Sequence, residues 1–182
     1  MITAILIIIA LAIVAVLALA ATRPNSFRIE RSTLVKTRPD EIFPLIEDFR
    51  QWQQWSPWEG IDPNLKRTYS GPAHGKGAVY AYEGNNKVGA GRMEILEATA
   101  PSRVLIKLDF IKPFKANNIA AFTLTPSTDG TTVNWAMSGP QPFLVKMMGL
   151  FFNMEKIVGP DFERGLARMK TLAEQKPGLL SG

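Results

Sequence analysis

Residues 27–58 read FRIERSTLVKTRPDEIFPLIEDFRQWQQWSPW, and three local patterns follow one another in this stretch. Alternate positions from Phe27 to Val35 are mostly apolar or β-branched, and this period of two predicts a strand. Residues 37–41 (TRPDE) then indicate a helix start with Thr37 as N-cap, because proline fits a first turn and acids favour the positive end of the helix dipole. We expect this helix to run to about Asp48.

The third pattern is a tryptophan-rich segment from Phe49 to Glu59, which holds Trp52, Trp55 and Trp58. An indole ring suits a half-wet boundary, so these residues are candidates for a ligand mouth or for contact with lipid headgroups. The alternative is that they fill one end of the core. In that case Trp52 and Trp55 are buried and Trp58 is the more exposed ring.

Downstream of this stretch, residues 65–137 predict short antiparallel strands. Apolar and polar residues alternate there, and Gly84-Asn85-Asn86 and Asp129-Gly130 are hairpin signals. This alternation is typical of a sheet with one apolar and one solvated face. Residues 143–172 then carry apolar side chains at helical spacing, and Gly159-Pro160 interrupts them. We expect either two helices or one sharply kinked helix, ending before Pro177.

Upstream of the stretch, residues 1–21 contain no charged side chain. A helix of this length spans about 30 Å, the thickness of the hydrocarbon core of a bilayer. A secretory signal peptide is the alternative, since Ala18-Leu19-Ala20 matches a cleavage pattern. The absence of a basic residue before the apolar run, and the length of that run, favour an uncleaved anchor.

Charge and composition limit the possible functions further. The net charge is +5, and basic residues from Arg23 to Arg38 supply most of it directly after the apolar run. The positive-inside rule then places the following domain in the cytoplasm, and the basic segment is expected near anionic headgroups. A basic face with interleaved aromatic residues is missing from the rest of the sequence, so we expect no nucleic-acid partner. Cysteine is absent, which excludes disulfides, thiolate metal sites and cysteine nucleophiles.

These elements predict an α+β architecture, in which a curved antiparallel sheet of about seven strands wraps around a long C-terminal helix. The N-terminal transmembrane helix is added to it. The expected organisation is an anchor over residues 1–22, a linker over 23–26, one domain over 27–176 and a tail over 177–182.

The order of elements and several short motifs resemble the helix-grip family, that is, the SRPBCC superfamily of START-like and polyketide cyclase/dehydrase-like proteins. The motifs are Arg31-Ser32, Pro39-Asp40-Glu41-Ile42-Phe43, Asp48-Phe49-Arg50-Gln51-Trp52, Trp55-Ser56-Pro57-Trp58, Gly91-Arg92-Met93-Glu94-Ile95 and Gly159-Pro160-Asp161-Phe162-Glu163-Arg164-Gly165-Leu166. The resemblance implies a cavity for a hydrophobic ligand between the sheet and the C-terminal helix. It implies no catalytic motif, because the superfamily shares none.

Candidate pocket residues are the large side chains expected to face that cavity, together with one arginine that suits a ligand carboxylate or phosphate. They are Trp58, Tyr80, Tyr82, Arg92, Met93, Phe110, Phe122, Trp135, Met137, Met147, Phe151 and Met154. The apolar residues of this set can equally fill an ordinary core, and a solvent-facing position is the alternative for Arg92. No catalytic residue is assigned. Glu59, Glu83 and Glu94 are the acids expected nearest the cavity, and His74 is expected in a solvent-exposed loop.

The leading hypothesis is therefore a single-pass protein of the inner (cytoplasmic) membrane that binds a lipid or another hydrophobic small molecule. No metal and no cofactor are expected, since no metal-binding or phosphate-loop motif is present. The alternatives are a polyketide cyclase/dehydratase-like enzyme acting on a hydrophobic substrate, and an accessory subunit of an inner-membrane complex.

Overall fold

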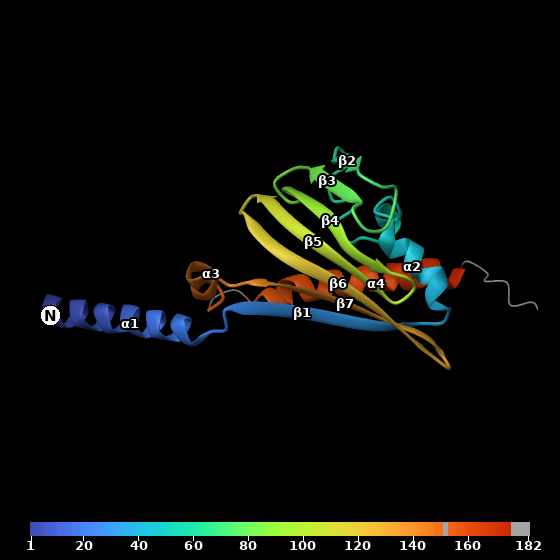
Figure 1. Cartoon of the computed structure of the whole chain (residues 1–182). Helices are drawn as coiled ribbons and strands as arrows, with labels where there is room; N and C mark the ends of the chain where they lie inside the picture. Colours follow the sequence, from blue (N-terminus) through green and yellow to red (C-terminus); the bar gives the residue numbers. More distant parts are fainter. Residues whose placement is uncertain (151–152, 176–182) are drawn as a thin grey trace, which may run out of the picture.

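The computed structural model describes residues 1–150 and 153–175 and contains one seven-stranded sheet with four α-helices (Figure 1). In chain order the elements are α1 (Ile2–Thr22), β1 (Ser26–Val35), α2 (Pro39–Glu47), the 3₁₀ turn η1 (Gln51–Gln54), β2 (Lys66–Ser70), β3 (Val79–Glu83), β4 (Ala90–Thr99), β5 (Arg103–Lys112), β6 (Ala116–Ser127), β7 (Gly130–Pro140), α3 (Phe143–Met148) and α4 (Met154–Gln175).

The sheet has the strand order β1-β7-β6-β5-β4-β3-β2, and every neighbouring pair is antiparallel. Consecutive strands from β2 to β7 are neighbours, so short turns are enough to connect them. Asp129-Gly130 forms the β6–β7 turn as the sequence predicts, and Gly130 has a positive φ of 136°. The curved antiparallel sheet, the long C-terminal helix and the N-terminal apolar helix confirm the predicted α+β helix-grip architecture.

Helix α4 covers the concave face of the sheet and packs mainly against β1 (Figure 1). Its buried side chains are Phe162, Leu166, Met169 and Ala173, together with Gly159 and Gly165. An added Cβ at Gly159 would clash with the guanidinium of Arg31, so glycine leaves room for that side chain against the helix. We call the side of the sheet that faces α4 the inner face.

Two details of the helices differ from the expectation. The C-terminal helical segment does consist of two helices, but the break lies between Met148 and Met154, while Pro160 lies inside α4. Arg31 of β1 contacts both Glu155 and Glu163, on either side of Pro160, and holds both parts of the helix on the strand.

At the start of α2, Arg38 rather than Thr37 is the N-cap, and no side chain caps the helix. Thr37 instead accepts a hydrogen bond at its carbonyl from the Thr131 hydroxyl, at 2.7 Å. That bond joins the end of β1 to β7, so Thr37 belongs to the strand connection.

Helix α1 is long and apolar enough to cross a membrane, and none of its apolar window is buried in the protein. Its length and composition alone support this statement, and a signal sequence shares both properties. The helix extends away from the sheet, and α3 lies beside its C-terminal end (Figure 1).

Candidate ligand-binding site

The space between α4 and the inner face is filled by aromatic rings. Trp135 of β7 stacks on Phe162 of α4, with ring centres 4.1 Å apart and an interplanar angle of 4°. Phe122 of β6 stacks on the same indole at 5.0 Å, and Trp55 meets it edge-on at 5.5 Å. In this structure the protein's own side chains occupy the region where the resemblance implies a cavity.

Within the described residues, two buried polar groups on this face lack a good hydrogen-bond partner. The Nε1 of Trp135 is buried and has no hydrogen-bond partner within residues 1–150 and 153–175. Asn118 of β6 is also buried, and its side-chain amide donates only to the Met137 sulfur, at 3.8 Å. A buried polar group without a good partner is destabilising, so these two groups are the places where a ligand atom would add most.

The inner face is covered unevenly along the strands. At the end near α1, Phe27, Tyr82, Leu108 and Phe110 are only half-buried. At the opposite end, beyond the tryptophan cluster, the inner-face residues Leu124 and Val133 are fully buried. The less covered end of the interior is therefore the one next to the apolar N-terminal helix.

A charged cluster borders this interior on the β2–β3 side. The Glu59 carboxylate accepts a hydrogen bond from the Tyr80 hydroxyl at 2.8 Å and two from the Arg67 guanidinium at 2.5 and 3.0 Å. Burial first, and the bond to Glu59 second, raise the pKa of the Tyr80 hydroxyl above its ordinary value. Tyr80 is thus held as a neutral donor beside a carboxylate.

Most of the candidate pocket residues lie together in this region. Tyr80, Met93, Phe122, Trp135 and Met137 belong to one buried cluster, and Trp58 and Tyr82 are half-buried against it. Phe110 pairs with Gly91 next to them, on the inner side of β5. The tryptophans follow the core interpretation: Trp52 and Trp55 are buried, their Nε1 groups donate to the carbonyls of Ile46 and Leu45, and Trp58 is the more exposed.

Arg92 does not belong to this group, which corrects the expectation that it faces a ligand there. It precedes the inward Met93, so strand alternation directs it to the outer face. There its guanidinium lies 2.8 Å from Glu94 and 3.9 Å from Asp109. Glu94 is therefore also on the outer face, and of the three acids named from the sequence only Glu59 contacts a side chain of the buried cluster.

Three further candidates also lie away from the inner face or cannot be placed. Met147 of α3 lies against α1, because α3 leaves the sheet after β7. Met154 is exposed at the first turn of α4, before the buried stripe of that helix begins. Phe151 lies outside the described residues.

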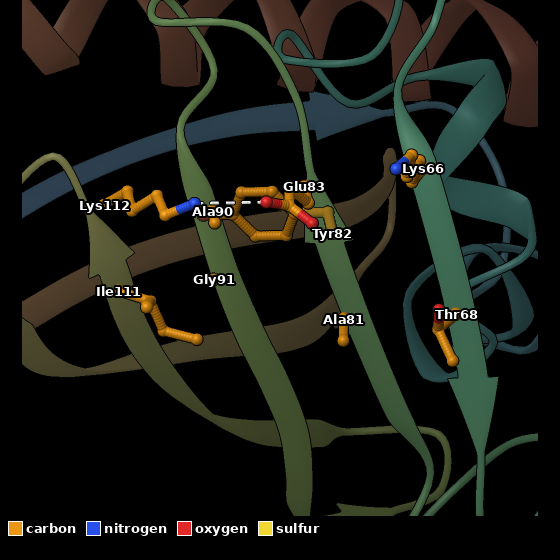
Figure 2. Close-up of a pocket in the computed structure, with 9 residues that line it drawn as sticks. All are labelled: Lys66, Thr68, Ala81, Tyr82, Glu83, Ala90, Gly91, Ile111 and Lys112. Carbon is orange, nitrogen blue, oxygen red and sulfur yellow. Dashed lines mark hydrogen bonds and ion pairs between the residues drawn. The ribbon is translucent and has the colours of Figure 1, made fainter.

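Two open hollows on the described part of the chain are separate from this interior. The larger, of about 340 Å³, lies over the ends of β2 to β5 and is lined by Lys66, Thr68, Ala81, Tyr82, Glu83, Ala90, Gly91, Ile111 and Lys112. Figure 2 shows the ion pair of Lys112 and Glu83 crossing it at 3.1 Å. Its mixed polar lining does not match the apolar pocket expected from the sequence, and Tyr82 is the one candidate that it includes. The smaller, of about 250 Å³, lies between α1 and α3.

Asn118 is the site residue that the sequence analysis missed. It occupies an inward position of β6, in the series Ala116, Asn118, Ala120, Phe122 and Leu124. The signal in the sequence was a single amide side chain among apolar residues that alternate along the same face of the strand.

His74 is exposed, as expected, and lies 3.6 Å from Glu47. Within the described residues, no group of three or more His, Asp or Glu side chains is arranged to hold a metal ion.

Comparison with known proteins agrees with this fold. A family model described as "Polyketide cyclase / dehydrase and lipid transport" matches residues 26–174, which is most of the chain. The fold and the match define a helix-grip protein. The chain belongs to the polyketide cyclase/dehydrase and lipid transport family, which confirms the resemblance seen in the sequence.

Solved structures share the fold at low sequence identity. A protein from Chromobacterium violaceum is 15% identical with a TM-score of 0.58, covering 84% of this chain and 100% of its own. The Aha1 protein of Colwellia psychrerythraea is 15% identical with a TM-score of 0.59, covering 84% and 99%. The di-domain ARO/CYC protein StfQ of the steffimycin biosynthetic pathway is 12% identical with a TM-score of 0.61, covering 85% and 52%. A search of curated protein sequences gives no match.

Proposed function

We propose that this protein is a membrane-attached binding protein for a lipid or another hydrophobic small molecule that carries a hydrogen-bond acceptor. The ligand would lie between α4 and the inner face of the sheet. The observation that supports this proposal most is the buried Trp135 Nε1 without a partner, in an apolar interior that also contains the weakly bonded Asn118. Ligand sites are typically apolar with a few convergent polar groups.

Because aromatic rings fill the interior, ligand uptake requires the first two turns of α4, residues 154–161, to move away from the sheet. Two features keep the cost of this movement low. Residues 154–161 bury only Gly159, whereas the rest of the helix buries Phe162, Leu166, Met169 and Ala173. The ion pairs of Arg31 with Glu155 and Glu163 are partly exposed, and such pairs contribute about 0–1 kcal/mol each. Burial of ligand surface at about 25 cal/mol per Å² drives the exchange.

Attachment through α1 would hold the less covered end of the interior beside the bilayer. A ligand drawn from the membrane then meets the site at a high effective concentration. The basic residues after the apolar run support a single-pass protein of the inner membrane with its domain in the cytoplasm.

Native mass spectrometry of the full-length protein, extracted in mild detergent, tests the proposal. The wild type is expected to retain an apolar molecule. N118L removes one hydrogen bond to it, worth about 1–3 kcal/mol or about 5- to 150-fold in affinity, without destabilising the fold, because a buried amide is replaced by an apolar group of similar size.

The matched control is N117L, the same substitution at the adjacent exposed position of β6. It is expected to retain the ligand like the wild type. Equal retention by N118L and N117L, or a wild type without any bound molecule, would contradict the proposal. A mass that reports a bound protein subunit would support the accessory role in its place.

An enzyme acting on the same kind of molecule is the second candidate, and the Glu59–Tyr80 pair favours it. In such a pair, the phenol of Tyr80 can donate a proton to the substrate, and the carboxylate of Glu59 can accept a proton from it. If the protein is a dehydratase-like enzyme, E59Q is expected to retain a molecule heavier by one water than the one held by the wild type. If the molecules retained by E59Q and by the wild type have identical masses, the dehydratase is excluded and the binding function remains.

A further inference from the structure

We infer that α3 is a second membrane-contacting element, which lies in the headgroup boundary of the bilayer beside α1. This inference rests on the membrane attachment proposed above. The partner is the lipid bilayer itself, and the contacting surface consists of Phe143, Leu144 and Met148.

The first observation is the position of α3. This short helix follows β7 and lies against the C-terminal half of α1 (Figure 1). The hollow of about 250 Å³ between the two helices is lined only by apolar side chains: Ala12, Ile13, Val16 and Leu17 of α1, with Met147 of α3. The surface of α3 is therefore continuous with that of the apolar helix.

The second observation is that α3 has the reverse of the polarity expected for a helix in water. Leu144 is 68% exposed, and Phe143 and Met148 are each 47% exposed. Lys146, its one charged residue, is 8% exposed and donates from Nζ to the Asn25 side-chain oxygen at 2.6 Å. Charged side chains normally face water, so a helix with a covered lysine and uncovered apolar residues is suited to an apolar surrounding.

The third observation is the depth at which α3 meets α1. Leu17 and Ala12 lie five and ten residues before Thr22, the last residue of α1. At a rise of 1.5 Å per residue these positions are about 8 and 15 Å from the helix end. Interfacial helices bury their apolar face about 5–10 Å into the headgroup and acyl boundary. If α1 spans the bilayer, the shallow side of this contact, at Leu17, lies within that depth, and Lys146 reaches back toward the polar linker at Asn25, as snorkelling lysines do.

The end of the domain that faces α1 carries matching features. The β5–β6 turn exposes Phe114 between Lys112 and Lys115. An apolar side chain flanked by lysines fits a surface of acyl chains and anionic headgroups. These residues favour lipid, and not a protein partner, as the surface that the exposed face of α3 contacts.

The absence of cysteine allows a direct test with single labels on the full-length protein. Cysteine is introduced at Leu144, at Val14 of α1, or at Thr128 in the β6–β7 turn at the opposite end of the domain. Each variant is labelled with an environment-sensitive NBD fluorophore and reconstituted into vesicles that contain anionic lipid. Nitroxide-bearing lipids and aqueous iodide then serve as quenchers.

The inference predicts that the Leu144 label emits at shorter wavelength, is quenched by a shallow nitroxide lipid and is protected from iodide. The Val14 label should be quenched by a deep nitroxide lipid, and the Thr128 label by iodide alone. All three side chains are exposed in the protein, so the labels leave its core intact.

The other outcomes are distinguishable. If the Val14 label is in lipid but the Leu144 label is as open to iodide as the Thr128 label, membrane attachment stands and the inference for α3 is wrong. If the Leu144 label is protected from both quenchers, a protein surface covers α3 and the inference is also wrong. If the Val14 label is itself open to iodide, the proposed attachment fails together with the inference.

Discussion

The side chain of Glu59 is only 8% exposed and has two partners, Arg67 and Tyr80. Taking a carboxylate out of water is unfavourable, and its partners compensate for that loss. Arg67 is itself about a quarter exposed, so this pair lies between a surface and a core ion pair. Its contribution is best measured by removing one partner at a time.

R67M is expected to destabilise the domain by about 3 kcal/mol, at the low end of the range for breaking a buried pair, because Glu59 then keeps only its bond to Tyr80. The double variant E59Q/R67M should be more stable than R67M, since no unpaired carboxylate remains. R103M is the matched control: its partner Glu97 lies 3.8 Å away on the surface, so its effect should stay below about 1 kcal/mol. Thermal unfolding in detergent measures all three variants, and equal losses for R67M and R103M would show that burial of Glu59 is unimportant.

Single residues also show what the sequence can predict about the candidate site. Alternation places Tyr80, Met93, Phe122 and Trp135 on one face, and the structure brings them together. The same alternation places Arg92 on the opposite face of the sheet. That residue was chosen as a candidate for its chemistry and not for its position in the strand pattern. The partner of a polar side chain cannot be predicted from the strand pattern. The unpaired Trp135 Nε1 therefore becomes visible only in three dimensions.

Among the elements, α4 shows how tertiary contacts override local preference. Pro160 removes a backbone donor and favours a helix start, yet the helix continues through it. Glutamates on both sides of the proline contact Arg31, a residue more than a hundred positions earlier, so both parts of the helix share one partner on β1. Strand alternation and the Asp129-Gly130 turn were predictable because they depend on near neighbours, whereas this contact depends on the complete fold.

The C-terminal end of α4 is joined to the β1–α2 connection through Glu174. Its carboxylate accepts hydrogen bonds from Lys170 Nζ and from the Lys36 backbone N–H, both at 2.7 Å. These two bonds, that of Lys170 first, lower the pKa of Glu174 below its ordinary value of 4.5. A carboxyl group whose pKa is lower in the folded state stabilises the fold above its unfolded-state pKa. That contribution is lost as the pH falls through the folded-state pKa.

E174Q is therefore expected to lower the melting temperature at neutral pH, and the difference from the wild type should shrink once the pH falls below 4.5. Melting curves recorded from pH 7 down to pH 3 measure this change. D129N, in the exposed β6–β7 turn, serves as the control for the loss of one negative charge. A difference between E174Q and the wild type that stays constant over the whole range would exclude the ionised contact as its cause.

For the molecule as a whole, folding redistributes the basic residues that follow the apolar run. In the sequence they form one segment from Arg23 to Arg38. In the structure, β1 carries the chain away from α1 over ten residues, about 33 Å, so Lys36 and Arg38 lie at the far end of the strand. Arg31 contacts α4, and Arg28 pairs with Glu30 at 2.7 Å. These basic residues are therefore close together in the sequence but spread along the length of the strand in the folded domain.

The predicted orientation can be measured with the T128C variant and a membrane-impermeant maleimide. If the domain is cytoplasmic, Thr128→Cys should react in inside-out membrane vesicles and remain unlabelled in intact cells. V14C should remain unlabelled in both preparations, because the bilayer shields it. Labelling of the T128C variant from outside intact cells would place the domain on the other side, and recovery of a chain that begins after Ala20 would identify a cleaved signal.

Only Arg23, Pro24 and Asn25 separate the end of α1 from the start of β1. Three extended residues reach about 10 Å, and the hydrogen bond between Lys146 and Asn25 restricts the movement of this linker further. If α1 stays in the bilayer, the domain is too closely tethered to travel across the cytosol as a shuttle does. Any bound ligand must then be released at the membrane, either into the lipid leaflet or to a partner protein that comes to the membrane.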